Sequence, residues 1–244
     1  MKAGTGLAFV IPTYQERESI IPLLTRLRSV YPGAVIFVVD DNSPDGTAMS
    51  VLEMSKSDKD VRLISRQTKQ GIGPAYHEGF ASALECSPSV VIQLDADGSH
   101  DPTEATRLIK PIVDGEADLV IGSRRVHGGA TIGWGRLRNA LSRFGSAYAR
   151  LLLRIKVHDA TSGYRAWSPT LLRNAIKTDT YANGYGFQIE MTWRARQLGA
   201  TLVEVPISFR ERTQGSSKMT ASIALEAALL VIALVGRRFP GTRS

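Results

Sequence analysis

The chain has 244 residues, of which 43% are hydrophobic and 22% charged, a balance typical of one globular domain rather than a disordered or fibrous chain. Cys86 is the single cysteine, which excludes an intramolecular disulfide and a cysteine-based metal cluster. The formal net charge of +7 indicates an anionic partner: nucleic acid, a phosphorylated metabolite or an acidic lipid surface. No motif supports nucleic acid, so we expect none to bind.

The first half of the chain alternates short apolar runs with amphipathic segments. Apolar runs predict buried strands at residues 7–11, 35–39, 61–64, 90–94 and 119–121. Apolar residues at helical spacing predict helices at residues 16–30, from residue 47, at 76–84 and at 103–114. This alternation predicts an α/β fold with a mostly parallel central sheet that is covered on both faces.

The second half of the chain is less regular. The pattern predicts a glycine-containing loop at 128–135, an arginine-rich helix at 137–153, a turn from 161, a helix at 187–198 and a strand at 202–205. We expect these elements to complete the same sheet, so that residues 1–220 form a single domain.

The two ends of the chain bear on where the protein acts. Residues 1–6 lack the features of a signal peptide, so we expect cytosolic synthesis. Residues 221–235 are apolar, are interrupted by Glu226 and fall short of the roughly 20 clean residues that span a bilayer. Arg237 and Arg238 follow. An apolar helix with a basic tail, here 221–244, suits docking on an anionic membrane surface, and equally a helix packed on the protein's own core.

An Asp-x-Asp motif follows the predicted strand at 90–94. Ligands of open α/β sheets bind at the carboxyl ends of the strands, which is where Asp95 and Asp97 lie. Their carboxylates offer the oxygen ligands that Mg²⁺ prefers. The same motif also occurs in ordinary turns, but its place after a buried strand favours a metal site.

A second acidic pair, Asp40-Asp41, ends the strand at 35–39. Part of the segment that follows fits an ordinary turn, with Asp45 or Thr47 as the N-cap of the next helix. Two acids directly after an apolar strand cost free energy unless they meet donors or a ligand. A carboxylate here fits hydrogen bonds to the base or ribose of a nucleotide.

Basic residues are frequent in the second half, and three of them stand out. Arg124 follows the strand at 119–121 and therefore reaches the same sheet edge as the acidic motifs. Arg212 and Lys218 flank a Gly-Ser-Ser segment of the kind that closes over phosphates. Guanidinium and ammonium groups both suit phosphate contacts.

Taken in order, five segments resemble the dolichol-phosphate (polyprenol-phosphate) mannosyltransferases of glycosyltransferase family 2. They are IPTYQERE at 11–18, DDNSPDGT at 40–47, DADGSHDP at 95–102, GSR at 122–124 and PISFRERTQGSSK at 206–218. TSGYR at 161–165 and GFQIEM at 186–191 add to the resemblance. The resemblance implies a GT-A, Rossmann-like fold, with residues 1–220 as one catalytic domain.

The resemblance also implies roles for particular residues. Residues that would hold the nucleotide of the sugar donor are Pro12, Tyr14, Glu16, Val39 and Asp41, with Lys69 as a weaker candidate. Asp95 and Asp97, backed by Ala96, would hold Mg²⁺ or Mn²⁺ and the diphosphate. Arg124, Arg212 and Lys218 would grip the phosphates of donor and acceptor, and with Asp97 they form the expected catalytic set. Ser99 stands where some members have a glutamine that also contacts the metal.

The implied reaction moves mannose from GDP-mannose to a polyprenyl phosphate, with inversion to a β-linked product. A phosphate acceptor is already largely dianionic near neutral pH, since its second pKa is about 6, so no general base is required. We expect a peripheral protein on the cytoplasmic face of a membrane, with or without a separate membrane-anchoring subunit. Two alternatives stay open: a polyprenyl-phosphate glucosyltransferase that uses UDP-glucose, and an inactive subunit that binds a nucleotide sugar.

Overall fold

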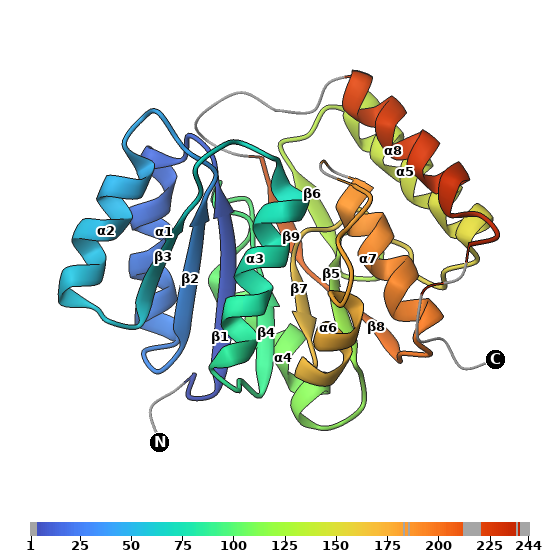
Figure 1. Cartoon of the computed structure of the whole chain (residues 1–244). Coiled ribbons are helices and arrows are strands. Elements are labelled where there is room, and N and C mark those ends of the chain that lie inside the picture. The colour runs from blue at the N-terminus through green and yellow to red at the C-terminus, as the bar shows by residue number, and fades with distance from the viewer. Residues whose placement is uncertain (1–3, 183, 185, 212–220, 238, 240–244) are drawn as a thin grey trace.

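The structure is a computed structural model that describes residues 4–182, 184, 186–211, 221–237 and 239 (Figure 1). Its strands are β1 (Leu7–Thr13), β2 (Val35–Asp40), β3 (Val61–Ser65), β4 (Val90–Gln93), β5 (Leu119–Ser123), β6 (Ala130–Ile132), β7 (Arg165–Trp167), β8 (Leu202–Pro206) and β9 (Ser208–Arg210). Its α-helices are α1 (Arg17–Val30), α2 (Thr47–Ser57), α3 (Ile72–Glu85), α4 (Ala105–Val113), α5 (Arg136–Leu153), α6 (Pro169–Ala175), α7 (Gly186–Gln197) and α8 (Ala221–Leu234). A 3₁₀ turn, η1 (Pro102–Glu104), precedes α4.

The central sheet has seven strands in the order β3-β2-β1-β4-β7-β5-β8. The pairs β1–β2, β2–β3, β1–β4 and β5–β8 are parallel, and β7 runs antiparallel to β4 and β5 on either side of it. The predicted α/β fold with a mostly parallel sheet is therefore confirmed. The sequence pattern missed β7, because three residues after a turn are too few to show a strand period.

Helices cover both faces of this sheet, and the strand residues alternate between two apolar layers. On β1, Phe9 and Ile11 join the layer that contains α1, whereas Ala8 and Val10 join the layer that contains α3. Figure 1 shows α1 and α2 on one side and α3, α6 and α7 on the other. Strands buried on both faces explain why the runs at 7–11 and 35–39 are apolar throughout.

The strand order reverses between β1 and β4. The chain runs outward from β1 to β2 and β3, and then returns to place β4 on the other side of β1. Such a reversal opens a crevice at the carboxyl ends of the two strands, where ligands of this class of sheet bind. Both acidic motifs follow strands that flank β1, namely β2 and β4, and so lie at this crevice as predicted.

A small second sheet and the last helix complete the described chain. In the second sheet β6 pairs in parallel with β9, and neither strand was predicted. Helix α8 lies beside α5 in Figure 1, and the Tyr148 hydroxyl of α5 donates a hydrogen bond to the Ala228 carbonyl of α8. Within the described ranges, no helix is both long and apolar enough to cross a bilayer.

The close approach of α3 to the sheet requires a glycine. A Cβ added to Gly79 would lie 2.4 Å from a methyl carbon of Val10 and 2.8 Å from one of Val39. Both neighbours belong to the strands that carry the crevice, β1 and β2. Gly79 therefore sets the distance between α3 and the strands behind the crevice.

We expect Gly79→Ala to lower the free energy of unfolding by about 1–3 kcal/mol, because the overpacking outweighs the better helix propensity of alanine. Gly145→Ala is the matched control, since a Cβ there has no atom within 4 Å and lies in a helix as well. We expect Gly145→Ala to raise the free energy of unfolding by up to about 1 kcal/mol. Urea unfolding of both variants measures the difference, and equal effects would contradict the assigned role of Gly79.

Candidate active site

The Asp-x-Asp motif leaves β4 in a tight turn. Leu94 and Ala96 point into the core, while the side chain of Asp95 is 30% exposed and Asp97 is half-buried. The Asp97 carboxylate accepts a hydrogen bond of 3.0 Å from the backbone N–H of Ser99. The alternation of buried and open side chains thus presents both carboxylates at the crevice.

The donor set of this motif fits a divalent cation that substrate phosphates help to hold. Mg²⁺ and Mn²⁺ in such sites are bound by one or two carboxylates, with the remaining ligands from water and phosphate. Among the described residues, no group of three His, Cys, Asp or Glu side chains could hold a metal by itself. The buried hydroxyl of Ser99, next to the motif, has no hydrogen-bond partner in the structure. Asp95 and Asp97 would therefore be the protein's ligands.

The acids of the second motif have separate partners. Asp40 is buried and accepts hydrogen bonds from the Thr13 hydroxyl and from the backbone N–H and hydroxyl of Ser43, at 2.6–2.9 Å. Asp40 thus joins the ends of β1 and β2. The predicted turn is present, because Asp45 accepts hydrogen bonds from the Thr47 N–H and hydroxyl. The predicted N-cap is wrong, because Gly46, in a left-handed conformation, precedes α2 in place of Asp45 or Thr47.

Asp41 binds the loop that leads into α3. Its carboxylate pairs with Arg66 at 2.6 Å and accepts backbone hydrogen bonds from Gln70 and Gly71 at 2.8–3.2 Å. The described contacts of Asp41 are therefore structural, and its contact with a nucleotide stays a prediction. Through Asp41 the loop at 66–71 is fixed beside the end of β2.

The other residues predicted to hold the nucleotide come together at the ends of β1 and β2. Pro12 and Val39 are register partners in the sheet, and Val39 is fully buried. The Lys69 ammonium lies 3.7 Å from the centre of the Tyr14 ring, a cation–π contact across the crevice edge. Glu16 accepts a hydrogen bond from the Ser19 hydroxyl in the first turn of α1. Lys69 and Tyr14 are thus neighbours although 55 positions separate them in the chain.

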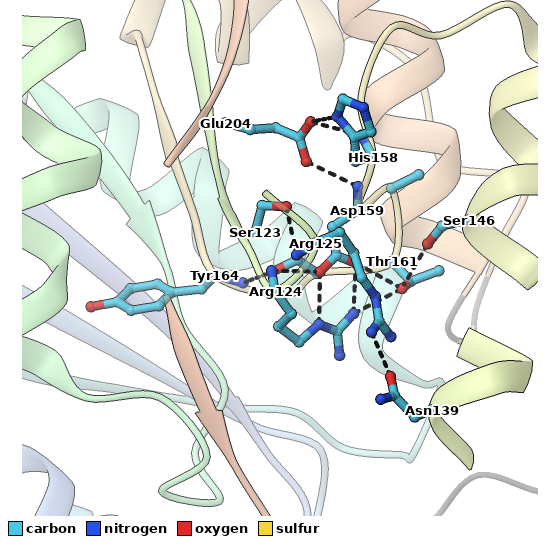
Figure 2. A network of polar contacts seen from close by, with 12 residues as sticks. Ser123, Arg124, Arg125, Asn139, Ser146, His158, Asp159, Thr161, Tyr164 and Glu204 are labelled. Atoms are coloured by element: carbon cyan, nitrogen blue, oxygen red, sulfur yellow. Dashed lines mark hydrogen bonds and ion pairs between the residues drawn. The ribbon is translucent and has the colours of Figure 1, made fainter. Parts of the chain in front are cut away.

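Arg124 lies at the end of β5 in a buried ion pair (Figure 2). Its guanidinium donates two parallel hydrogen bonds to Asp159, at 2.6 and 2.7 Å, and a third to the Thr161 hydroxyl at 2.9 Å. Burial alone would raise the pKa of the Asp159 carboxyl, but the charge and hydrogen bonds of Arg124 outweigh it and lower that pKa. Arg124 therefore lies at the carboxyl end of β5, as predicted, and the Nε and Nη2 atoms of its guanidinium face Asp159.

Further contacts fix the loop that carries Asp159 (Figure 2). Glu204 of β8 accepts the backbone N–H groups of His158 and Asp159 at 2.7 and 2.9 Å. Arg165 is fully buried and donates to the carbonyls of Ala160 and Ser162. Burial lowers the pKa of Arg165 to about 10, so it remains charged at neutral pH. The segment 158–163, which we call the Asp159 loop, is thus held from both sides.

The Asp159 loop links the basic and acidic parts of the site. Asp159 and Thr161 bind Arg124, as described above. Gly163 lies against Asp95, because a Cβ there would be 2.6 Å from the Asp95 Oδ2 atom. Arg124 and Asp95 are therefore positioned by residues of one short loop.

The sequence predictions missed several residues of this site. Asp159 stands beside the TSGYR segment without a recognisable motif of its own. Trp134 and Phe209 both lie 5.2 Å from the Arg124 guanidinium, and Arg138 stacks over Trp134 at 4.2 Å. Only a tertiary fold brings these positions together. The predicted phosphate-binding residues Arg212 and Lys218 lie outside the described residues.

The fold and the family together make this chain a glycosyltransferase of the GT-A type. The chain belongs to glycosyl transferase family 2, whose model matches residues 8–174. It is 45% identical over 223 residues to the undecaprenyl-phosphate mannosyltransferase of Micrococcus luteus, covering 91% of this chain and 90% of that protein. It is 44% identical over 219 residues to the polyprenol monophosphomannose synthase of Mycolicibacterium smegmatis, covering 89% and 82%. The family predicted from the motifs is confirmed.

Solved structures share the fold. Glucosyl-3-phosphoglycerate synthase from Mycobacterium tuberculosis, in complex with Mn²⁺, UDP and glucosyl-3-phosphoglycerate, superimposes with a TM-score of 0.73 at 20% identity. The match covers 98% of this chain and 82% of that one. The complex with UDP alone gives a TM-score of 0.72 at 21% identity, with 98% and 83% coverage.

The ion pair at Asp159 makes a measurable prediction. Asp159→Asn leaves the Arg124 guanidinium buried without its counter-charge, and we expect the free energy of unfolding at pH 7 to fall by about 3–5 kcal/mol. Because the pKa of Asp159 is lowered in the fold, its contribution is present above the unfolded value of 3.8 and is lost as the pH falls through the folded pKa. Urea unfolding at several pH values measures both effects.

Asp114→Asn is the control for this experiment, because Asp114 forms an exposed pair with Lys110. We expect that variant to lose no more than about 1 kcal/mol. If Asp159→Asn were as stable as Asp114→Asn, the ion pair would not support the loop.

Proposed function

We propose that the protein transfers mannose from GDP-mannose to a polyprenyl phosphate and gives a β-linked polyprenyl phosphomannose. The names of two relatives at 44–45% identity support the mannosyl group and the lipid phosphate. The observation that carries the proposal is the Asp159 loop, which contacts both the Asp95 carboxylate and the buried Arg124. In the proposed mechanism Asp95 would bind the cation. A reaction between a sugar diphosphate and a lipid phosphate needs a carboxylate that holds a cation and a basic side chain that offsets the repulsion between the phosphates.

The step is a direct displacement. An oxygen of the lipid phosphate attacks the anomeric carbon, a new carbon–oxygen bond forms, and the bond from that carbon to the diphosphate breaks. GDP leaves with the bonding electrons. Attack from the face opposite to an α-linked diphosphate inverts the configuration. The acceptor is already deprotonated, since its second pKa is about 6, and needs no base.

The chain's own residues have three tasks in this step. Asp95 and Asp97 would hold Mg²⁺ or Mn²⁺, which would supply positive charge to the departing diphosphate. Tyr14, Lys69 and the ends of β1 and β2 form the surface for the nucleoside. Arg124, with Arg212 and Lys218, would bring two anionic phosphates together against their repulsion.

The proposed mechanism predicts that the rate of sugar transfer depends strongly on the Asp97 carboxylate. We expect Asp97→Ala to lower the rate of sugar transfer roughly 100-fold or more, because positive charge at the leaving group is lost. Asp114→Ala removes an exposed aspartate elsewhere and should keep the wild-type rate. Transfer of radiolabelled mannose into polyprenyl phosphate, with Mg²⁺ or Mn²⁺ present, measures both variants.

The same assay separates the two alternatives. Transfer from UDP-glucose in preference to GDP-mannose, with tighter binding of UDP than of GDP, would favour a glucosyltransferase. GDP binding without transfer from any donor would favour an inactive subunit. Full activity of Asp97→Ala would contradict the metal assignment.

We further propose that α8 (Ala221–Leu234) docks the protein peripherally on the cytoplasmic face of a membrane, where a polyprenyl acceptor resides. Three side chains of α8, Leu225, Leu229 and Ile232, are 57–61% exposed. Large apolar side chains left in water favour insertion into the lipid interface. The exposed Arg237 follows the helix and suits anionic head groups.

Replacement of Leu225, Leu229 and Ile232 by serine tests this docking. We expect the affinity for vesicles that contain anionic phospholipid to fall roughly 10-fold, because the apolar contact area is lost. Leu52→Ser changes an exposed leucine of α2 and should bind as wild type does. Co-sedimentation measures the affinity. No binding of wild-type protein would instead favour a separate anchoring subunit.

A further inference from the structure

The Asp95 carboxylate is confined by three different segments of the chain. The Tyr76 hydroxyl of α3 donates a hydrogen bond of 3.1 Å to its Oδ1 atom. The backbone of Gly163 lies directly against Oδ2. The His100 Nε2 atom is 3.5 Å from Oδ2, and its ring is packed between Tyr164 and Phe209. Asp97, in contrast, accepts a hydrogen bond from its own turn.

Tyr76 is the most rigid of these neighbours. Its ring is fully buried and is stacked between Phe80 and Phe187, with centroid distances of 5.3 and 5.4 Å. Packing on both faces of the ring therefore holds the hydroxyl within hydrogen-bond distance of the Asp95 carboxylate.

The position of Tyr76 in α3 connects it to the second acidic motif. Helix α3 begins at Ile72, immediately after Gly71, whose backbone N–H donates to Asp41. Slightly more than one helical turn later, Tyr76 reaches Asp95. A single helix, held close to the sheet by Gly79, thus contacts both acidic motifs.

We propose that Tyr76 is a positioning residue for divalent-cation binding, which holds the Asp95 carboxylate in the orientation that ligates the cation. This inference rests on the metal dependence of the proposed function. Groups that hydrogen-bond to a metal ligand fix its orientation, and their loss typically weakens metal affinity 10–100-fold although no ligand is removed. The stacked ring keeps the hydroxyl in place before a cation arrives.

Tyr76→Phe removes the hydroxyl and keeps the stacked ring. We expect the dissociation constant of Mn²⁺ in the presence of GDP, measured by electron paramagnetic resonance of the free ion, to rise about 10-fold. Binding of GDP without metal should be unchanged. In the transfer assay, the metal concentration for half-maximal rate should rise by the same factor, while the rate at saturating metal stays within about twofold of wild type.

Tyr148→Phe is the matched control, because it removes a tyrosine hydroxyl that hydrogen-bonds the Ala228 carbonyl at the α5–α8 contact. It should leave the Mn²⁺ titration as in wild type. Gly163→Ala is a second variant, which pushes on the carboxylate from the opposite side and should also weaken Mn²⁺ binding. It shows separately whether Mn²⁺ binding depends on the orientation of the Asp95 carboxylate, and unchanged binding in this variant would contradict the proposal.

The outcomes separate this inference from the proposed function. If wild-type protein binds Mn²⁺ with GDP and Tyr76→Phe binds it equally well or more tightly, the positioning role is overturned and the metal-dependent transfer stands. If wild-type protein binds no Mn²⁺, both are overturned. A weaker titration for Tyr76→Phe alongside an unchanged Tyr148→Phe supports the positioning role.

Discussion

The site depends on burying an arginine charge beside a sheet edge that also gathers carboxylates. A guanidinium taken out of water is costly unless a counter-charge and hydrogen bonds compensate it. Asp159 supplies both to Arg124, and Glu204 and Arg165 in turn hold the loop on which Asp159 lies. Because Gly163 of that loop rests on Asp95, the compensation of one charge also fixes the position of another. Contacts with this one loop thereby fix the side chains of both Arg124 and Asp95 before any substrate binds.

The architecture of the first half followed from periodicity alone. Apolar runs such as 35–39 can be buried on both faces only in a covered parallel sheet, so strands, helices and the location of the acids at the strand ends were all predictable. Helix α3 began four residues before its predicted start at 76, because its first turn is rich in small residues and shows little apolar period. The five ordered motifs supplied the family, which periodicity could not.

The polar partners within the site were not predictable in the same way. Asp159, Trp134 and Tyr76 lie in segments without a motif, and their roles arise from contacts across the fold. Asp41 illustrates the opposite case: its place was predicted, but its hydrogen bonds to Gln70 and Gly71 required the loop geometry. A strand pattern shows where a carboxylate must be, and only packing shows what it touches.

The antiparallel strand β7 also governs how the fold can assemble. It is the only described strand that pairs with both β4 and β5, yet it lies more than forty positions after β5 in the chain. Until residues 165–167 have left the ribosome, β4 and β5 each present an unpaired edge, and edges of that kind invite pairing with other chains. The strands β3-β2-β1-β4 and the strands β5-β8 are therefore joined late, by a three-residue strand. The strand that carries Arg124 at its end is thus joined to the strands that carry the acidic motifs only after about two-thirds of the protein has been synthesised.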